Sequence, residues 1–145
     1  MRFKFKIQKG QASLEYMVML GLSLGVFAAI LYFSSTLIAS TSAQIGVDSA
    51  FRAVNHMQES SDFIYIHGYP SKTQINVYIP PSVEDVTIFN NNSINVRVGV
   101  GEYYTDVHGV TRGLVQGDLS DISTEGNFVL DIYAHDNEWV NITVI

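Results

Sequence analysis

The residues best suited to chemistry lie together near the start of the sequence, in the segment Gly10–Glu15 (Gly-Gln-Ala-Ser-Leu-Glu). Glu15 is a lone carboxylate, because no other charged residue occurs between it and Asp48. If the chain were cut after Gly10, a new α-amino group would appear at Gln11, about one helical turn before Glu15. An acid near a bilayer is costly without a partner, and such an amine on a neighbouring copy would provide one. The alternative is that Glu15 only stabilises a helix N-terminus, by about 0.3–1 kcal/mol.

Two other positions could carry a covalent modification, since each begins an Asn-x-Ser/Thr acceptor sequence for N-glycosylation. Asn91 falls in an expected turn and Asn141 on the wet face of an expected strand, so both could be reached, although such short sequences also arise by chance. The four histidines lack the spacing of zinc ligands, and no nucleophile elbow or phosphate-binding loop occurs in the sequence. We therefore expect no metal, no cofactor and no enzymatic activity.

The element that must position Glu15 is the apolar run Tyr16–Ile38, which holds 23 residues without a charge or a proline. As a helix rising about 1.5 Å per residue it would extend roughly 34 Å, enough to cross a hydrocarbon core of about 30 Å. A cleaved secretory signal is the competing interpretation, and a small-residue site for it exists at Ala43, before Gln44. The run is longer than the roughly 7–15 apolar residues typical of such signals, so it predicts a transmembrane helix.

Charge is distributed unevenly along the chain. Residues 1–10 hold four of the eight Lys and Arg residues and none of the fourteen Asp and Glu residues. A basic leader before the apolar run and an acidic body after it predict a cytoplasmic N-terminus and an exported body. An acidic body also argues against nucleic acid as a partner, since phosphate binding needs a basic surface.

The junction and the apolar run together resemble a known processing signal. The sequence Lys-Gly-Gln-Ala-Ser-Leu-Glu-Tyr at residues 9–16, followed by Met-Val-Met-Leu, is similar to the class III signal peptide of archaeal type IV pilins, with its Gln-x-Ser-x-Glu motif. The resemblance implies cleavage between Gly10 and Gln11 by a prepilin peptidase, on the cytoplasmic side of the membrane. In the assembled filament, Glu15 would then be neutralised by the Gln11 amine of a neighbour.

The same resemblance implies a structural role. The processed helix would wait among membrane lipid until pilus assembly machinery packed it, with copies of itself or related pilins, into a surface filament serving adhesion or surface attachment. The alternative is an extracellular binding domain, anchored in the membrane or secreted through a signal peptide, that does not polymerise. Gly21 and Gly25 form a small-xxx-small pair that would allow close helix packing, although glycine is also common in membrane helices generally.

Beyond the apolar run the pattern changes twice. Apolar residues first recur at three- and four-residue spacing, which predicts that the helix continues to about Asp62 with one face covered by a sheet. From Thr73 the apolar period becomes two, as in strands with one buried face. The helical stripe consists of Val47, Ala50, Phe51, Val54 and Met57, of which Phe51, Val54 and Met57 are expected in the core.

Turn residues divide the second part into strands. Asn90–Asn92 and Asp136–Glu138 are expected to be hairpin turns, and Pro80 to end the first strand. Tyr103–Val107 is expected to pair with Val110–Val115. The sequence thus predicts an α+β protein with a leader at residues 1–10, a long hydrophobic helix at residues 11–62, and a small antiparallel β-sheet domain at residues 63–145 packed on the C-terminal half of that helix.

Overall fold

The computed structural model describes the backbone of residues 8–136 and 138–145, and side chains from Ala12 onward. Residues 1–7 of the expected leader lie outside the described residues, as do the side chains of residues 8–11 and Asn137 of the expected C-terminal turn. The chain divides into two compact units, residues 1–40 and residues 41–145. Each unit is described by itself.

The first unit consists of the first part of helix α1 (Gln8–His67). Every side chain from Ala12 to Ser40 is exposed, including large apolar ones such as Phe27 at 60% and Tyr32 at 71%. This helix is long and apolar enough to span a membrane, with a mean hydropathy of 2.1 in its most apolar window. The expectation of one helix able to cross a bilayer is therefore confirmed.

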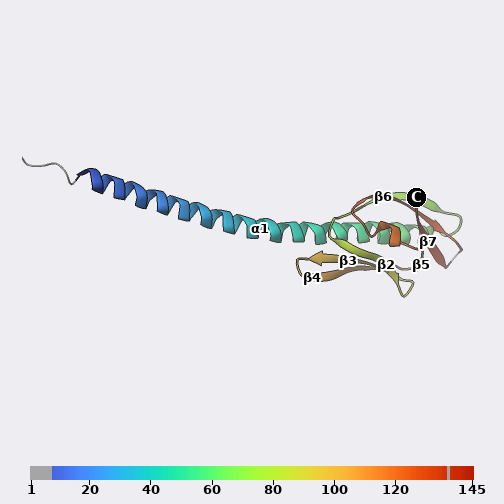
Figure 1. The fold of residues 1–145 in the computed structure, drawn as a ribbon. Helices are drawn as coiled ribbons and strands as arrows, with labels where there is room; N and C mark the ends of the chain where they lie inside the picture. Colours follow the sequence, from blue (N-terminus) through green and yellow to red (C-terminus); the bar gives the residue numbers. More distant parts are fainter. Residues whose placement is uncertain (1–7, 137) are drawn as a thin grey trace, which may run out of the picture. The chain divides into compact units, whose positions relative to one another are not determined.

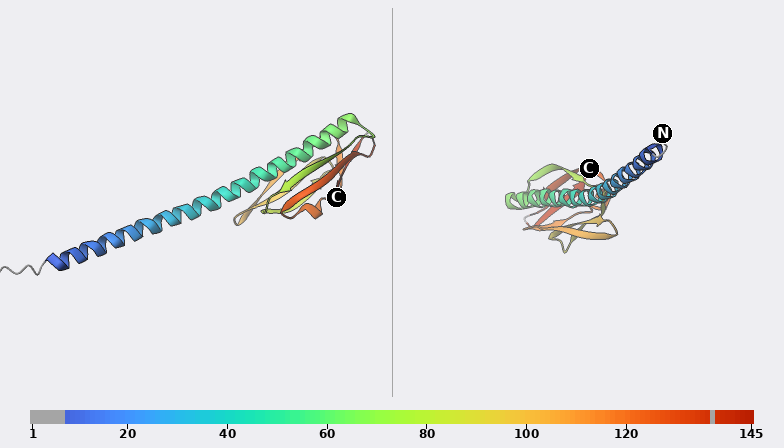
Figure 2. Two further views of the ribbon diagram at one scale, coloured as in Figure 1. Left: turned by 90° about the horizontal axis from the view of Figure 1, so that it is seen from above. Right: turned by 90° about the vertical axis from the view of Figure 1, so that its left-hand side faces the viewer.

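The second unit contains the rest of α1 and two β-sheets packed on it, so the expected α+β class is confirmed (Figure 1). Figure 2 shows this part of α1 running along the strands. Helix α1 ends at His67, five residues beyond the expected end at Asp62. The extra turn brings Ile64 into the core, and Gly68, with φ of 66°, donates its amide to the Ile64 carbonyl at 3.0 Å and closes the helix.

One sheet has four strands and the other has three. The order in the larger sheet is β1-β6-β7-β5, and in the smaller sheet it is β2-β3-β4. A short 3₁₀ helix, η1 (Ser120–Ile122), lies in the connection from β5 to β6. The strands are β1 (Lys72–Ile79), β2 (Val83–Phe89), β3 (Ser93–Val100), β4 (Tyr103–Val110), β5 (Leu114–Gln116), β6 (Gly126–Ala134) and β7 (Trp139–Val144).

Several local expectations are confirmed. Strand β1 ends at Ile79, directly before Pro80, because proline cannot donate to a ladder. Asn90 and Asn91 both have positive φ, 51° and 58°, which is the geometry of a type I′ hairpin turn between β2 and β3. Strands β6 and β7 pair antiparallel, as expected for a C-terminal hairpin.

The pairing expected between Tyr103–Val107 and Val110–Val115 is wrong. Strand β4 runs without a break to Val110 and pairs with β3, whereas β5 pairs in parallel with β7. Gly109 lies between the two expected segments, but it is part of β4 and allows close contact with α1, because a Cβ there would lie 2.8 Å from Val54 Cγ1. A parallel pair needs a long connection, and the loop through η1 together with β6 provides it.

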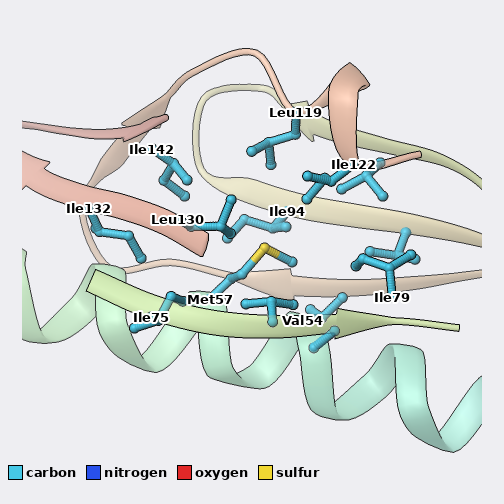
Figure 3. Packing of buried hydrophobic residues seen from close by; sticks show 14 of the residues in the cluster. Val54, Met57, Ile75, Ile79, Ile94, Leu119, Ile122, Leu130, Ile132 and Ile142 are labelled. Atoms are coloured by element: carbon cyan, nitrogen blue, oxygen red, sulfur yellow. The ribbon is translucent and has the colours of Figure 1, made fainter. Parts of the chain in front are cut away.

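The hydrophobic core lies between α1 and the two sheets. Met57 is fully buried and extends from α1 into the cluster that includes Ile94 and Leu130 (Figure 3). Each such side chain contributes about 1.5–3 kcal/mol by leaving water. The expected place of Phe51 in the core is wrong, because Phe51 is 52% exposed. The buried stripe of α1 consists of Gly46, Ala50, Ala53, Val54, Met57, Ser61 and Ile64.

Candidate functional site

The junction proposed from the sequence lies in the first turns of α1. The backbone at Gly10, Gln11 and Glu15 is helical, so Gln11 and Glu15, four residues apart, share one face of the helix. The Glu15 side chain is exposed. A carboxylate placed this way is available to a group on another molecule.

The helix that follows Glu15 is apolar on all sides. Large exposed hydrophobic residues occur at nearly every position from Tyr16 to Phe33, so no single face of this segment is polar. A helix of this kind is buried either in lipid or among other helices. A Cβ added at Gly21 or Gly25 would meet nothing within 4 Å in the single chain, so another helix could approach closely there.

Four hydroxyl groups of the first unit, those of Ser23, Ser35, Thr36 and Ser40, donate to backbone carbonyls of the same helix. Ser23 donates to the Leu20 carbonyl at 2.9 Å, and Ser35 donates to the Tyr32 carbonyl at 2.8 Å. Such bonds leave no unpaired hydroxyl donor at these positions when the helix enters an apolar environment. These four hydroxyl groups therefore add little polar character to the surface that this segment presents to lipid or to another helix.

The outer face of the smaller sheet carries an ion pair that the sequence reasoning missed. Arg97 on β3 donates to both carboxylate oxygens of Asp106 on β4, at 2.9 and 3.3 Å, and its guanidinium lies 4.7 Å from the centre of the Tyr104 ring. These hydrogen bonds and the positive charge lower the pKa of Asp106 below its usual value. Arg97 and Asp106 lie directly opposite each other in the pairing of β3 with β4. The ion pair could therefore be predicted from the sequence only if the register of this hairpin were known.

The ion pair borders a hollow of about 440 Å³ on the same sheet face. Phe89, 64% exposed, lies on β2, and Asn95 and His108 face each other across β3 and β4. Within the described residues, no group of three His, Asp or Glu side chains is close enough together to hold a metal ion. The side chains that line the hollow are a mixture of polar, charged and aromatic groups.

The two acceptor asparagines differ in their surroundings. Asn91 is exposed in the β2–β3 turn, where only its backbone carbonyl is engaged, by the Val115 amide at 2.6 Å. Asn141 is half-buried on β7; its side-chain Nδ2 donates to the Tyr133 hydroxyl at 3.1 Å, and its Oδ1 is buried. N-glycosylation attaches a sugar to the side-chain nitrogen Nδ2. In the folded chain the Asn91 side chain is exposed, whereas Nδ2 of Asn141 is engaged in its hydrogen bond to Tyr133.

We expect Asn91 to be the modified position if the exported chain is glycosylated. Ser93→Ala removes its acceptor sequence without changing the turn asparagines, and Thr143→Ala removes the other. Intact mass spectrometry should show the glycan lost in Ser93→Ala and retained in Thr143→Ala. Loss in Thr143→Ala alone would contradict this assignment.

Comparison with protein-family models, with curated proteins and with solved structures gave no match. The architecture, a long apolar N-terminal helix followed by two β-sheets, is compatible with a pilin-like protein.

Proposed function

We propose that this chain is a pilin-type structural subunit of a surface filament, made as a membrane-inserted precursor with a cytoplasmic N-terminus. A prepilin peptidase would remove residues 1–10, and assembly machinery would then transfer the helix from lipid to a filament of copies or related pilins. The observation that carries the proposal is the helix from Tyr16 to Phe33, which is apolar on every side and directly follows the Gly10–Gln11 junction and the lone Glu15.

Two physical arguments support assembly over simple anchoring. A plain anchor needs only an apolar helix, whereas this chain also places one exposed carboxylate four residues after Gln11. Cleavage there would create an α-amino group able to pair with the Glu15 carboxylate of a neighbour, and that pair would set the axial register between subunits. Glycines at positions 21 and 25 further favour close approach of a second helix.

The proposal assigns no enzymatic activity and no cofactor to the chain. Its partners are the peptidase, the assembly machinery, membrane lipid before assembly, and other copies of itself. The sheets of the second unit would form the outward surface of the filament. Their exposed aromatic and charged side chains would make the contacts that serve attachment.

The test of this proposal is N-terminal sequencing of the mature protein from cells that express the full chain. A start at Gln11 supports a processed filament subunit. A start at Gln44 would instead support a secreted domain released after Ala43, and an intact Met1 would support a plain membrane anchor. Either of these two results would overturn the proposal.

Replacing Glu15 by glutamine tests the role of the carboxylate in assembly. We expect normal membrane insertion but strongly reduced filament growth, because removing one partner of a buried ion pair costs about 3–5 kcal/mol. Filaments per cell are counted by negative-stain electron microscopy, with membrane-bound protein measured by immunoblot. Glu59→Gln, which neutralises an exposed acid on the later part of α1, is the matched control and should assemble normally. Filaments of normal abundance in Glu15→Gln would exclude the proposed pairing.

A further inference from the structure

The turn between β3 and β4 protrudes beyond the core of the second unit. In the later half of β4, burial alternates as in an ordinary half-covered strand, with Val107 buried and His108 exposed. In its first half, Tyr103–Asp106, both faces of the strand are exposed. After Val98, the last buried residue of β3, no residue is buried until Val107 of β4, so the turn between them extends past the covered part of the sheet. The β3–β4 turn is therefore a projection rather than part of a covered sheet.

The side chains on this projection are those of an interaction surface. Tyr103 is 79% exposed and Tyr104 is 63% exposed, and Glu102 between Gly101 and Tyr103 is exposed too. Gly101 has φ of 65°, which makes the turn tight. Exposed tyrosines are favoured at protein interfaces, because a rigid ring gives contact area at a low cost in conformational entropy. We define residues 101–104 as the hairpin tip.

A groove of about 280 Å³ lies elsewhere on the same unit, between α1 and β1. From α1 it is lined by Ser49, Arg52 and His56, and from β1 by Asn76 and Tyr78. The groove lies at β1, an edge strand of the larger sheet. Ala53 and Val77 complete its lining, which therefore combines apolar, polar and aromatic side chains. We define it as the Arg52 groove.

Arg52 differs from the other cations of the second unit. Lys72 is paired with Asp131, Arg97 with Asp106, and Arg112 with Asp62. Among the described residues, no carboxylate lies within 4.0 Å of Arg52, although residues 41–145 hold thirteen acidic residues against four Lys and Arg. Packed copies of so acidic a unit repel one another, and a cation with no carboxylate within 4.0 Å in the described part of its own chain is able to offset that repulsion.

We propose that the hairpin tip of one copy docks into the Arg52 groove of a second copy, with Glu102 of the tip paired to Arg52. This inference rests on the proposed function, because it identifies the contact between outer domains of neighbouring subunits. Glu102 is the proposed partner of Arg52 because of its position on the surface as well as its charge. Glu102 lies on the narrow hairpin tip, which can enter a groove. Asp85, another acid of the same sheet, lies within strand β2 and cannot enter a groove in this way.

The two surfaces are different parts of one chain, so the contact is heterologous. A heterologous contact that does not close into a ring produces an open helical polymer, whereas contact between identical surfaces stops at a dimer. Each subunit would then offer one tip and one groove, and would take part in two such contacts. This is the contact pattern required of a filament subunit.

The first experiment exchanges the two charges in cells that make filaments. Arg52→Glu and Glu102→Arg should each lower the number of filaments by at least about tenfold, which corresponds to roughly 1.4 kcal/mol per contact. The double variant should restore the number, because the opposite charges meet again in reverse order. As the matched control, Arg52→Glu combined with Glu125→Arg, an exposed acid outside the tip, should stay defective. Single variants with normal filaments, or a double variant as defective as the singles, would overturn the docking.

The second experiment uses the absence of cysteine from the sequence. In the variant carrying both His56→Cys and Tyr103→Cys, mild oxidation of isolated filaments should give a ladder of dimers, trimers and longer species on a non-reducing gel. Each single variant should give no ladder. Filaments in which the double variant remains monomeric, or stops at dimers, would overturn the proposed contact while leaving the pilin proposal intact. A wild-type chain that forms no filament and starts at a residue other than Gln11 would instead overturn the function on which the contact rests.

Discussion

Replacing Gly10 by leucine is expected to leave the precursor uncut. A peptidase that accepts glycine before the scissile bond has no space for a branched side chain, and steric misfit in such a pocket lowers the specificity constant by about 10- to 200-fold. The uncut chain keeps its four basic leader residues and has no α-amino group at Gln11. It should therefore stay in the membrane and not enter filaments. Intact mass and N-terminal sequencing of the membrane fraction measure the result.

The control for this substitution is the same change at a glycine of the same helix. Gly21→Leu adds a side chain where a Cβ would meet nothing within 4 Å, so processing should remain normal even if filament packing suffers. Processing that fails in both variants would point to a general defect of insertion. Normal maturation of Gly10→Leu would eliminate the proposed junction.

Replacing Met57 by alanine is expected to lower the free energy of unfolding of the sheet-bearing unit by about 2–5 kcal/mol. Met57 is fully buried between α1 and both sheets, and the smaller side chain would leave a cavity that the surrounding strands cannot fill (Figure 3). The unit is small, so a loss of this size would unfold a large fraction of the molecules under mild denaturant. Fluorescence of the single tryptophan, Trp139, in a urea titration measures it.

The matched control is Phe51→Ala. The sequence pattern places both residues in the core, but Phe51 is 52% exposed, and surface substitutions usually change stability by no more than about 0.5 kcal/mol. We therefore expect nearly wild-type unfolding for Phe51→Ala. Equal destabilisation in the two variants would mean that the face of α1 on the sheets includes Phe51, contrary to the observed stripe.

The sequence predicted correctly those features of the fold that are determined by residues close together in the chain. Strand ends and turns followed from single residues, such as Pro80 after β1 and Asn90 with its positive φ. The length of α1 was underestimated because the buried stripe passes from Met57 to Ile64 through Ser61, a polar residue that interrupts the apolar spacing. Ser61 can be buried because its hydroxyl donates to the Met57 carbonyl at 2.7 Å. The pairing expected between Tyr103–Val107 and Val110–Val115 was wrong because Gly109, which lies between them, marks a close approach to α1 within one strand, and sequence alone does not distinguish such a glycine from one in a turn.

The candidate functional residues also fall into two groups, those predictable from the sequence and those that only the structure shows. The lone acid at Glu15 and the membrane-length apolar helix follow from residue order alone, since charge and hydropathy act along the chain without help from distant segments. The proposed junction at Gly10 is likewise a feature of local sequence, through its resemblance to a processing signal. The ion pair of Arg97 with Asp106 and the hydrogen bond of the Asn141 amide to Tyr133 depend on which strands lie side by side. That Arg52 has no carboxylate within 4.0 Å among the described residues is likewise visible only in three dimensions. Strand order is set by long-range packing that no local pattern encodes, so only the tertiary structure decided which polar groups pair within the chain and which remain available to another copy.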